Sequence, residues 1–228
     1  MIVVKPEATI LGVTKFLGPN DGSSSDPALL IERAGRVCWK SEGKSTPGSA
    51  AGFCDRVLRQ FGHESISEHA SATVHWVTDR IVANQLVRHR IAAYSQESTH
   101  YLNYSKVGQF DRQIRVCKPW DIEEGTLAYT IWAEAMQYAE NAYFQLIEDC
   151  KVKHYEARYC LPLGLKSELV ATYNFRTWVH VIRKRTELNS SGKPVNTPET
   201  HYLMLDTAKA LMSLCPEVFT PKAFGIAE

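Results

Sequence analysis

The sequence predicts one globular domain in which α-helices and β-strands are mixed along the chain. The 228 residues are 44% hydrophobic and 22% charged, which is the composition of an ordinary protein with a buried core. Apolar residues recur at helical spacing in several segments and alternate with polar residues in others. Since no internal repeat, low-complexity tract or linker interrupts the pattern, we expect residues 1–228 to form a single domain.

The predicted strands are short and bounded by turn-forming residues. Ala72, Val74 and Trp76 alternate with polar residues, as in a strand with one buried face. Runs of β-branched and aromatic residues between glycine and proline indicate strands elsewhere. We therefore expect strands within residues 2–16, 70–77, 101–117 and 169–174.

The predicted helices each have one apolar face. Asp26 and Pro27 supply an N-cap and a first-turn proline to the first of them. The longest helical pattern covers residues 122–152, and its stripe of Ala, Tyr and Leu needs the core or a subunit contact to cover it. Helices are expected at residues 26–39, 50–61, 79–90, 122–152, 156–162, 175–186 and 198–214.

The charges of the chain nearly cancel. With 26 basic and 25 acidic residues, the net charge of +1 gives no attraction of the whole molecule to nucleic acid or to a membrane. Any binding of an anion must therefore depend on a local cluster. We accordingly expect no nucleic-acid partner and no membrane partner.

The six cysteines and the N-terminal sequence indicate a cytoplasmic protein. The cysteines contain no CxxC pair, which argues against a zinc knuckle or a redox motif and fits free thiols in a reducing compartment. The first residues lack a basic segment followed by an apolar run and a cleavage site. No apolar stretch reaches the roughly 18 residues that a membrane helix needs.

Residues 88–101 carry an unusual density of polar groups. The end of a helix dipole explains Arg88 and Arg90, but it leaves the Ser-Gln-Glu-Ser run at residues 95–98 unexplained. The chain has no GxGxxG or GxxxxGK[ST] motif, so phosphates would have to be held mainly by side chains. Arginine suits phosphate and carboxylate groups, which predicts a polyanionic, nucleotide-like ligand. The arginines concerned are Arg88, Arg90, Arg158, Arg176 and Arg185.

A second polar segment begins at His63 and ends at His69. Its two histidines and two glutamates resemble metal ligands, and His75 or His89 could join them in space. The segment is not the HExxH motif, however, and no cysteine completes a zinc pattern. The simpler interpretation is a capped turn, so we expect no metal site.

The arrangement of Arg88, His89, Arg90, seven further residues and Ser98 is the RHRx7S signature of the flavin-dependent thymidylate synthases. The chain resembles this family in further blocks that occur in the same order and span nearly its whole length. These blocks are Gly62-His63-Glu64-Ser65 with Glu68-His69, Leu86-Val87, Ala157-Arg158 before Leu161-Pro162, Asn174-Phe175-Arg176 with Trp178 and His180, and Arg185-Thr186.

The resemblance implies a fold and a reaction. The fold would be α+β, with a helical core and a flanking antiparallel sheet, assembled as a homotetramer with shared active sites. The enzyme would convert dUMP to dTMP, with methylenetetrahydrofolate as the one-carbon donor and NADPH-reduced FAD as the source of hydride. Tetrahydrofolate would be released, and no protein nucleophile would attack the base.

The resemblance also implies roles for individual residues. Arg185, Ser98 and His63 would be catalytic, with Arg185 favouring the ionised N3 of the uracil. The FAD set would comprise Ser65, Glu68, Arg88, His89, Arg90, Gln96, Asn174, Arg176 and His180, with His63 beside them. The nucleotide set would comprise Gln85, Arg88, Gln96, Glu97, Ser98, His100, Arg158 and Arg185.

Two residues depart from the family pattern. Many members have Glu where Gln96 stands, and the family usually has a phosphate-clamping arginine where His100 stands. An imidazole lacks the permanent charge and the double fork of arginine, which should weaken the clamp at neutral pH. The substitution could equally mark another C5 modification, such as hydroxymethylation, of a different pyrimidine nucleotide.

Other classes of protein also fit parts of the sequence. A non-catalytic nucleotide-binding or RNA-binding relative could use the same arginines. A metal-dependent hydrolase could use His63, His69 and His89. A flavin absorbance spectrum would distinguish the synthase from both.

Overall fold

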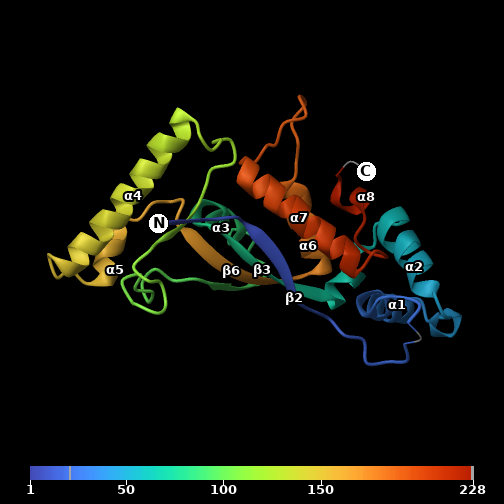
Figure 1. The fold of residues 1–228 in the computed structure, drawn as a ribbon. Helices are drawn as coiled ribbons and strands as arrows, with labels where there is room; N and C mark the ends of the chain where they lie inside the picture. Colours follow the sequence, from blue (N-terminus) through green and yellow to red (C-terminus); the bar gives the residue numbers. More distant parts are fainter. Residues whose placement is uncertain (21, 227–228) are drawn as a thin grey trace. The chain divides into compact units, whose positions relative to one another are not determined.

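The computed structural model describes residues 1–20 and 22–226 and contains helices and an antiparallel sheet (Figure 1). The α+β class expected from the sequence is therefore confirmed. The contacts divide the chain into two compact units, each built from separate segments. Unit 1 contains Met1–Glu7, Trp76–Arg88 and Ser95–Val170, and unit 2 contains Ala8–His75, His89–Tyr94 and the described residues from Ala171 onward. The single domain expected from the sequence stays a prediction.

The main sheet of the described chain has the strand order β2-β3-β6-β4. β3 and β6 are antiparallel, because Phe175 N donates to Ala70 O at 2.9 Å whereas Arg80 N donates to Leu165 O at 3.2 Å. Alternate residues of both strands are buried, as the period of two in the sequence predicts. The strands are β2 (Glu7–Val13), β3 (Ser71–Asp79), β4 (Ala93–Gln96) and β6 (Lys166–Asn174).

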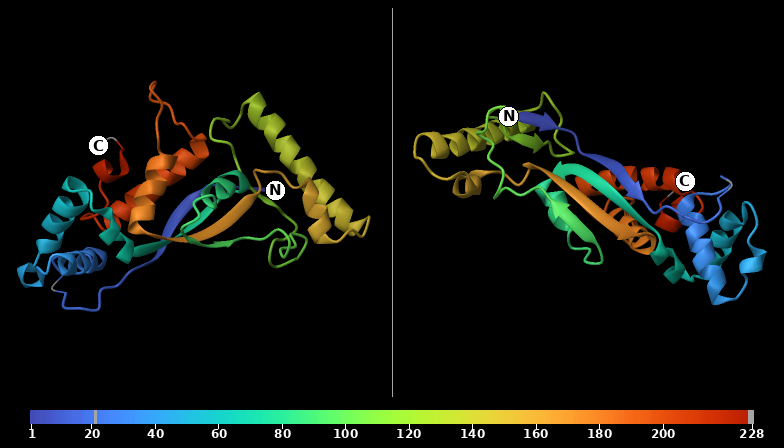
Figure 2. Two further views of the ribbon diagram at one scale, coloured as in Figure 1. Left: turned by 180° about the vertical axis from the view of Figure 1, so that it is seen from behind. Right: turned by 90° about the horizontal axis from the view of Figure 1, so that it is seen from below.

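Unit 1 has its own apolar core. Tyr104, Ile114, Val116, Tyr143 and Leu165 are buried there. β1 (Ile2–Val4) runs parallel to β5 (Arg115–Cys117). Figure 2 shows the long helix α4 beside the short α5. The helices of this unit are α3 (Arg80–Leu86), α4 (Leu127–Glu148), α5 (His154–Ala157) and the 3₁₀ turn η4 (Arg158–Cys160).

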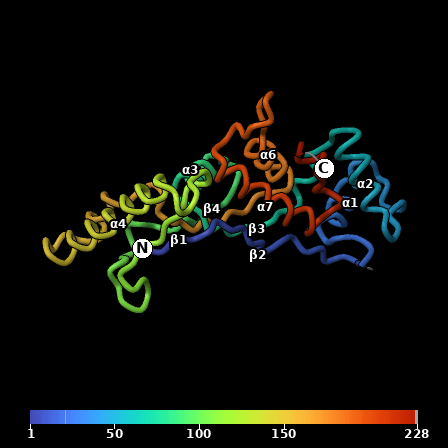
Figure 3. The backbone as a smooth tube through the Cα atoms, turned by 45° about the horizontal axis from the view of Figure 1, so that its top comes forward, coloured from blue at the N-terminus to red at the C-terminus, as the bar shows by residue number. Residues whose placement is uncertain are grey.

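Unit 2 contains most of the helices, and α1 lies against α2 in Figure 3. The buried Trp178 of α6 anchors that helix to β3, because its Nε1 donates to Ala72 O at 3.0 Å. Gly62 has a φ of +69°, which favours glycine and ends the preceding helical segment. The elements are α1 (Asp26–Cys38), η1 (Glu42–Lys44), α2 (Ser49–Cys54), η2 (Asp55–Gln60), η3 (Glu64–His69), α6 (Phe175–Arg185), α7 (Pro198–Leu214) and α8 (Pro221–Phe224).

Several predicted elements are confirmed, and others are wrong in extent. The expected strand at the start of residues 101–117 is replaced by turns, because Asn103 Oδ1 accepts from Ser105 N and holds a local turn. The predicted helix 79–90 ends at Leu86. The long helix begins at Leu127, because the Thr126 side chain caps it by accepting from Tyr129 N.

The apolar stripe of α4 is only partly covered within the described chain. Tyr143 is fully buried, but Leu127, Ile131 and Tyr138 are 76%, 59% and 74% exposed. Across the described residues, every helix is too short or too polar to cross a bilayer.

Candidate active site

The Arg-His-Arg motif lies where the chain passes from unit 1 to unit 2. Arg88 ends a segment of unit 1, and His89 begins a segment of unit 2. Because α3 ends at Leu86, the motif is not helical. Arg88 and Arg90 are exposed and make no ion pair or hydrogen bond with the residues that the structure describes. Their guanidinium groups are therefore available to an anion.

The half-buried part of the motif is His89, which forms a hydrogen bond with Arg185. Arg185 Nε donates to His89 Nε2 at 3.0 Å, which requires that nitrogen to be unprotonated. Burial, followed by the charges of Arg185 and His180, lowers the pKa of His89 from 6.5 to about 4. The imidazole is therefore neutral at physiological pH and holds the guanidinium in one orientation.

Two further groups fix this arrangement. Arg185 Nη1 donates to Asn196 Oδ1 at 3.0 Å, and Asn196 Nδ2 donates to Lys184 O at 2.8 Å. The His180 ring lies edge-on to His89, with centroids 5.9 Å apart. The Arg185 guanidinium is thus held from both sides, by a motif residue and by a residue of the loop before α7.

A pair of tyrosines supports the motif from the sheet. Tyr94 of β4 donates its hydroxyl hydrogen to His89 O at 2.7 Å, and its oxygen lies 2.6 Å from the Tyr173 hydroxyl. Burial raises the pKa of both tyrosines, so both stay protonated. Burial also lowers the pKa of Arg185, although both tyrosines oppose this shift.

The start of α6 and the η3 turn carry other members of the FAD set. Arg176 donates to Glu68 at 2.6 Å. The Asn174 side chain accepts from Thr177 N at 2.8 Å and so caps α6, which gives this residue a structural role of its own. Ser65 lies exposed on η3. These residues come together in unit 2, whereas Arg88 belongs to unit 1.

His63 precedes η3 and contacts exposed aromatic rings. Its imidazole stacks on Trp39, with centroids 5.7 Å apart and planes at 14°. Phe61 lies on another side at 6.0 Å. Trp39 and Phe61 are 48% and 60% exposed, so His63 belongs to an aromatic surface patch rather than to the core.

The nucleotide set falls in unit 1 apart from Arg185. Glu97 is held by the protein itself, because Lys166 Nζ binds its Oε2 at 2.8 Å and Glu168 N donates to the same oxygen at 3.1 Å. The other oxygen accepts from the Tyr104 hydroxyl at 3.3 Å. The side chains of Glu97 and Lys166 are only 10% and 9% exposed. Glu97 therefore organises the end of β4 as well as being a candidate ligand residue.

The loop after Glu97 brings more of this set together. Ser98 begins a turn in which its Oγ accepts from His100 N at 3.3 Å. Arg158 Nη1 donates to Thr99 Oγ1 at 3.3 Å. The His100 ring lies 5.3 Å from Tyr155. The loop and the α5–η4 turn thus form one polar surface that carries Arg158 and His100.

Gln85 and Gln96 are half-buried members of the same unit. Gln96 Nε2 lies 3.5 Å from Ser167 Oγ, a long contact at the end of the sheet. Gln85 is on α3, one residue before Leu86, where the helix ends.

Some residues of the site were not found from the sequence. Asn196 stands in a polar loop, and only the fold brings its amide to Arg185. Lys166 and Tyr173 gave no signal beyond a strand pattern. In the part of the chain that the structure describes, no group of three or more His, Cys, Asp or Glu residues could hold a metal ion, and His63, His69 and His89 form no such group.

The fold and these side chains define an α+β protein with exposed arginines and a half-buried, neutral histidine suited to an anionic ligand. The family model described as "Thymidylate synthase complementing protein", Thy1, matches residues 22–217, and the chain belongs to this family.

Relatives in other organisms bear the name flavin-dependent thymidylate synthase. The relative from Geobacter sulfurreducens is 32% identical over 163 residues, which cover 68% of this chain and 67% of the relative. Relatives from Mycobacterium bovis and Mycobacterium tuberculosis are 28% identical over 233 aligned positions, covering 92% of this chain and 87% of theirs.

A solved structure has a similar fold. The crystal structure of a UMP/dUMP methylase, PolB, from Streptomyces cacaoi bound with 5-Br dUMP gives a TM-score of 0.75. The match covers 99% of this chain and 97% of that one at 21% identity. This likeness concerns the fold alone.

The lowered pKa of His89 predicts a dependence of stability on pH. The unfolded chain binds a proton at His89 as the pH falls from 6.5 towards about 4, whereas the folded chain does not. The free energy of unfolding should therefore fall with pH through this window. In denaturant titrations between about pH 7 and about pH 4.5, wild type should lose more stability than His89→Gln. His69→Gln is the control for removing an exposed histidine, and equal slopes for wild type and His89→Gln would contradict the assignment.

Proposed function

We propose that this protein is a flavin-dependent thymidylate synthase that converts dUMP to dTMP. The observation that carries the proposal is the Arg185–His89 hydrogen bond, which joins the RHRx7S motif to the end of α6. Membership of the Thy1 family supports it. In this proposal NADPH is the reductant and methylenetetrahydrofolate the one-carbon donor.

The side chains of unit 2 fit FAD. A flavin dinucleotide carries an anionic diphosphate, and Arg90 offers an exposed guanidinium without a competing carboxylate in the described chain. We assign Ser65, Glu68, Asn174, Arg176 and His180 to the same cofactor, and the family resemblance adds Arg88, His89 and Gln96. When bound, reduced FAD would supply the hydride, and the folate would supply the carbon.

Arg185 is assigned to the uracil. A fixed positive charge beside N3 favours the ionised ring and so makes C5 more nucleophilic. The hydrogen bonds from Arg185 to His89 and Asn196 hold that charge in place without neutralising it, because both partners are uncharged. Desolvation also strengthens the field of a half-buried guanidinium.

The remaining roles follow the resemblance. Gln85, Arg88, Gln96, Ser98 and Arg158 would hold the nucleotide, with Glu97 and His100 at the same surface. We assign His63 and Ser98 to the reacting end of the site. A homotetramer with shared sites, a cytoplasmic location and the lack of a nucleic-acid partner complete the proposal.

An absorbance spectrum of the purified protein tests the proposal first. Flavin bands should be present or should appear when FAD is added, and NADPH without oxygen should bleach them faster when dUMP is present. With methylenetetrahydrofolate added, dTMP should form. A colourless protein that takes up no FAD would refute the proposal.

His100 is the observation that favours a second candidate, a flavin- and folate-dependent C5 modification of another pyrimidine nucleotide. Analysis of the product distinguishes the two, because hydroxymethylation and methylation give products of different mass. If dTMP is the main product formed from dUMP, the second candidate is excluded.

Removing the amide of Asn196 should impair catalysis through Arg185. Asn196→Ala deletes a neutral group that orients the guanidinium, and a lost hydrogen bond to a charged group corresponds to roughly a tenfold fall in kcat. Asn196→Asp keeps the acceptor oxygen but places a carboxylate beside the guanidinium and removes the amide that donates to Lys184 O, so it should lower kcat as well.

The measurement is steady-state dTMP formation, with flavin content as the control for folding. If Asn196→Ala lowered kcat no more than an exposed-loop change such as Ser191→Ala, Asn196 would have no positioning role.

Replacing His100 by arginine should tighten the binding of dUMP. The ring is exposed and lies against Tyr101 and Tyr155, so a longer side chain can extend into solvent. A bidentate guanidinium–phosphate contact should lower the Kd of dUMP roughly tenfold. Calorimetric titration measures the Kd, and His69→Arg controls for a new arginine elsewhere. If His100→Arg bound dUMP with an unchanged or weaker affinity, this prediction would be contradicted.

A further inference from the structure

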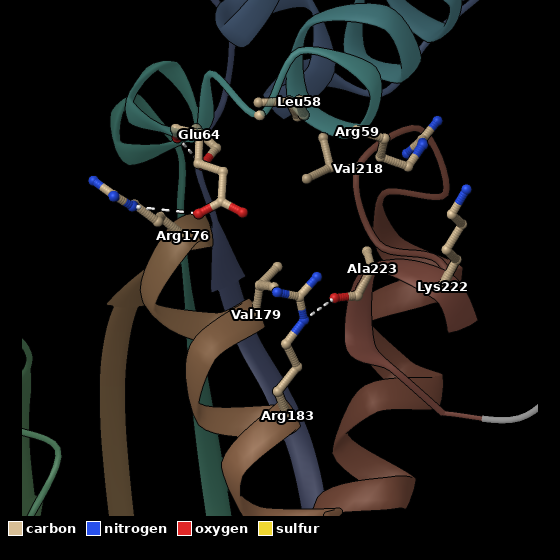
Figure 4. A pocket seen from close by; sticks show the side chains of 11 residues that line it. Leu58, Arg59, Glu64, Arg176, Val179, Arg183, Val218, Lys222 and Ala223 are labelled. Carbon is tan, nitrogen blue, oxygen red and sulfur yellow. Dashed lines mark hydrogen bonds and ion pairs between the residues drawn. The ribbon is translucent and has the colours of Figure 1, made fainter.

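A surface pocket in unit 2 lies between α6, the π-helix η2, the 3₁₀ helix η3 and the C-terminal helix α8 (Figure 4). Its cavity has a volume of 190 Å³. Leu58, Val179 and Val218 supply the apolar part of its lining. Binding pockets for whole drug-sized ligands usually measure about 300–1,000 Å³, so this one suits the end of a longer molecule.

Cationic side chains dominate the polar lining. Among the described residues of the pocket wall, Arg59, Arg176, Arg183 and Lys222 are cationic, and Glu64 is the acidic member. Since the whole chain is nearly neutral, this is a local excess of positive charge.

Two of these cations already have carboxylate partners. Arg176 lies 3.6 Å from Glu64, and Arg59 donates to Asp55 at 2.7 Å. Figure 4 shows Glu64 and Arg176 together on one side of the pocket and Arg59 near Lys222 on the other. These paired side chains form part of the pocket wall. The two other cationic residues of the lining, Arg183 and Lys222, are available to bind a ligand.

Arg183 and Lys222 are the available cations. Arg183 uses only its Nε, which donates to Ala223 O at 2.6 Å, and neither Nη atom has a partner among the residues described. Its guanidinium points into the space beside Val179 in Figure 4. Lys222 makes no hydrogen bond or ion pair with any described residue, although its charge reaches Asp55.

The chemistry of the pocket favours a terminal phosphate monoester. Two free cations match the double charge of such a group, and the outer edge of a guanidinium binds two phosphate oxygens at once. The internal diphosphate of a dinucleotide carries less charge per phosphate and needs a groove open at both ends. The apolar wall suits the sugar next to the phosphate.

We infer that this pocket binds the 2′-phosphate of the reductant NADPH and gives the protein its preference for NADPH over NADH. The inference rests on the proposed function for the presence of a nicotinamide reductant. Arg176 links the pocket to the FAD set, because it lines the pocket and also binds Glu68. A reductant anchored here would reach the flavin from the side of η3 and α6.

The test compares the two reductants on the full-length protein loaded with FAD. Lys222→Glu should lower kcat/KM for NADPH-driven flavin reduction at least tenfold and leave the NADH value unchanged, because only NADPH carries the phosphate. Arg183→Gln should do the same. Lys209→Glu reverses the charge of an exposed lysine of α7 and is the matched control.

A binding measurement separates the possible sources of phosphate. Adenosine 2′,5′-bisphosphate should bind wild type and compete with NADPH, and adenosine without phosphate should not. Equally strong competition by 5′-AMP would show that the pocket takes any terminal phosphate monoester and would overturn its assignment to NADPH. Lys222→Glu should lose the bisphosphate binding while keeping its flavin absorbance.

Several results would overturn the inference. Equal losses with NADPH and NADH would show that the pocket does not recognise the phosphate, and loss of bound FAD from Lys222→Glu would assign the pocket to the flavin instead. Wild-type protein that accepts neither FAD nor a nicotinamide would refute the proposed function and the inference together, whereas a wild type active equally with both reductants would refute the inference alone.

Discussion

The candidate site depends on one contact, the hydrogen bond from Arg185 to a neutral His89. An imidazolium at this position would have no lone pair for Arg185 and would repel it. Burial and the neighbouring cations prevent that protonation, since they lower the pKa of His89 to about 4. The burial that lowers the pKa of His89 therefore leaves its Nε2 able to accept a hydrogen bond from Arg185, and this bond orients the guanidinium.

A second constraint is the use of motif residues by the fold itself. Glu97 belongs to the nucleotide set, yet Lys166, Tyr104 and the backbone of Glu168 occupy its oxygens. Lys166 also pairs with the Glu168 carboxylate at 2.5 Å, so changing Glu97 would remove these contacts from the end of β4 without leaving Lys166 unpaired. A loss of activity on changing Glu97 would consequently report a displaced β4 as readily as a lost ligand contact. Asn174 presents the same ambiguity through its capping of α6.

The sequence predicted those elements whose signals are local. The helix expected from Asp26 and Pro27 does form, although Ser25 and not Asp26 is its N-cap, and alternation placed β3 correctly. The strand expected near Tyr101 failed because Asn103 offers its own side chain to the backbone and stabilises a turn. The RHRx7S motif likewise identified His89 and Arg90 by type. It could not predict that Asn196, from a distant loop, holds Arg185, because that contact exists only in the folded chain.

The arginines of this protein also differ in whether a carboxylate already binds their guanidinium group. Arg176 is held by Glu68 and Glu64, so a phosphate must compete with two carboxylates for its guanidinium. Arg90 and the Nη groups of Arg183 have no such competitors among the described residues. An anion gains the full charge-assisted hydrogen bond only from groups of the second kind. Arginine count alone is therefore a poor guide to a phosphate site, and the pairing state of each guanidinium, visible only in the fold, decides which of them can bind.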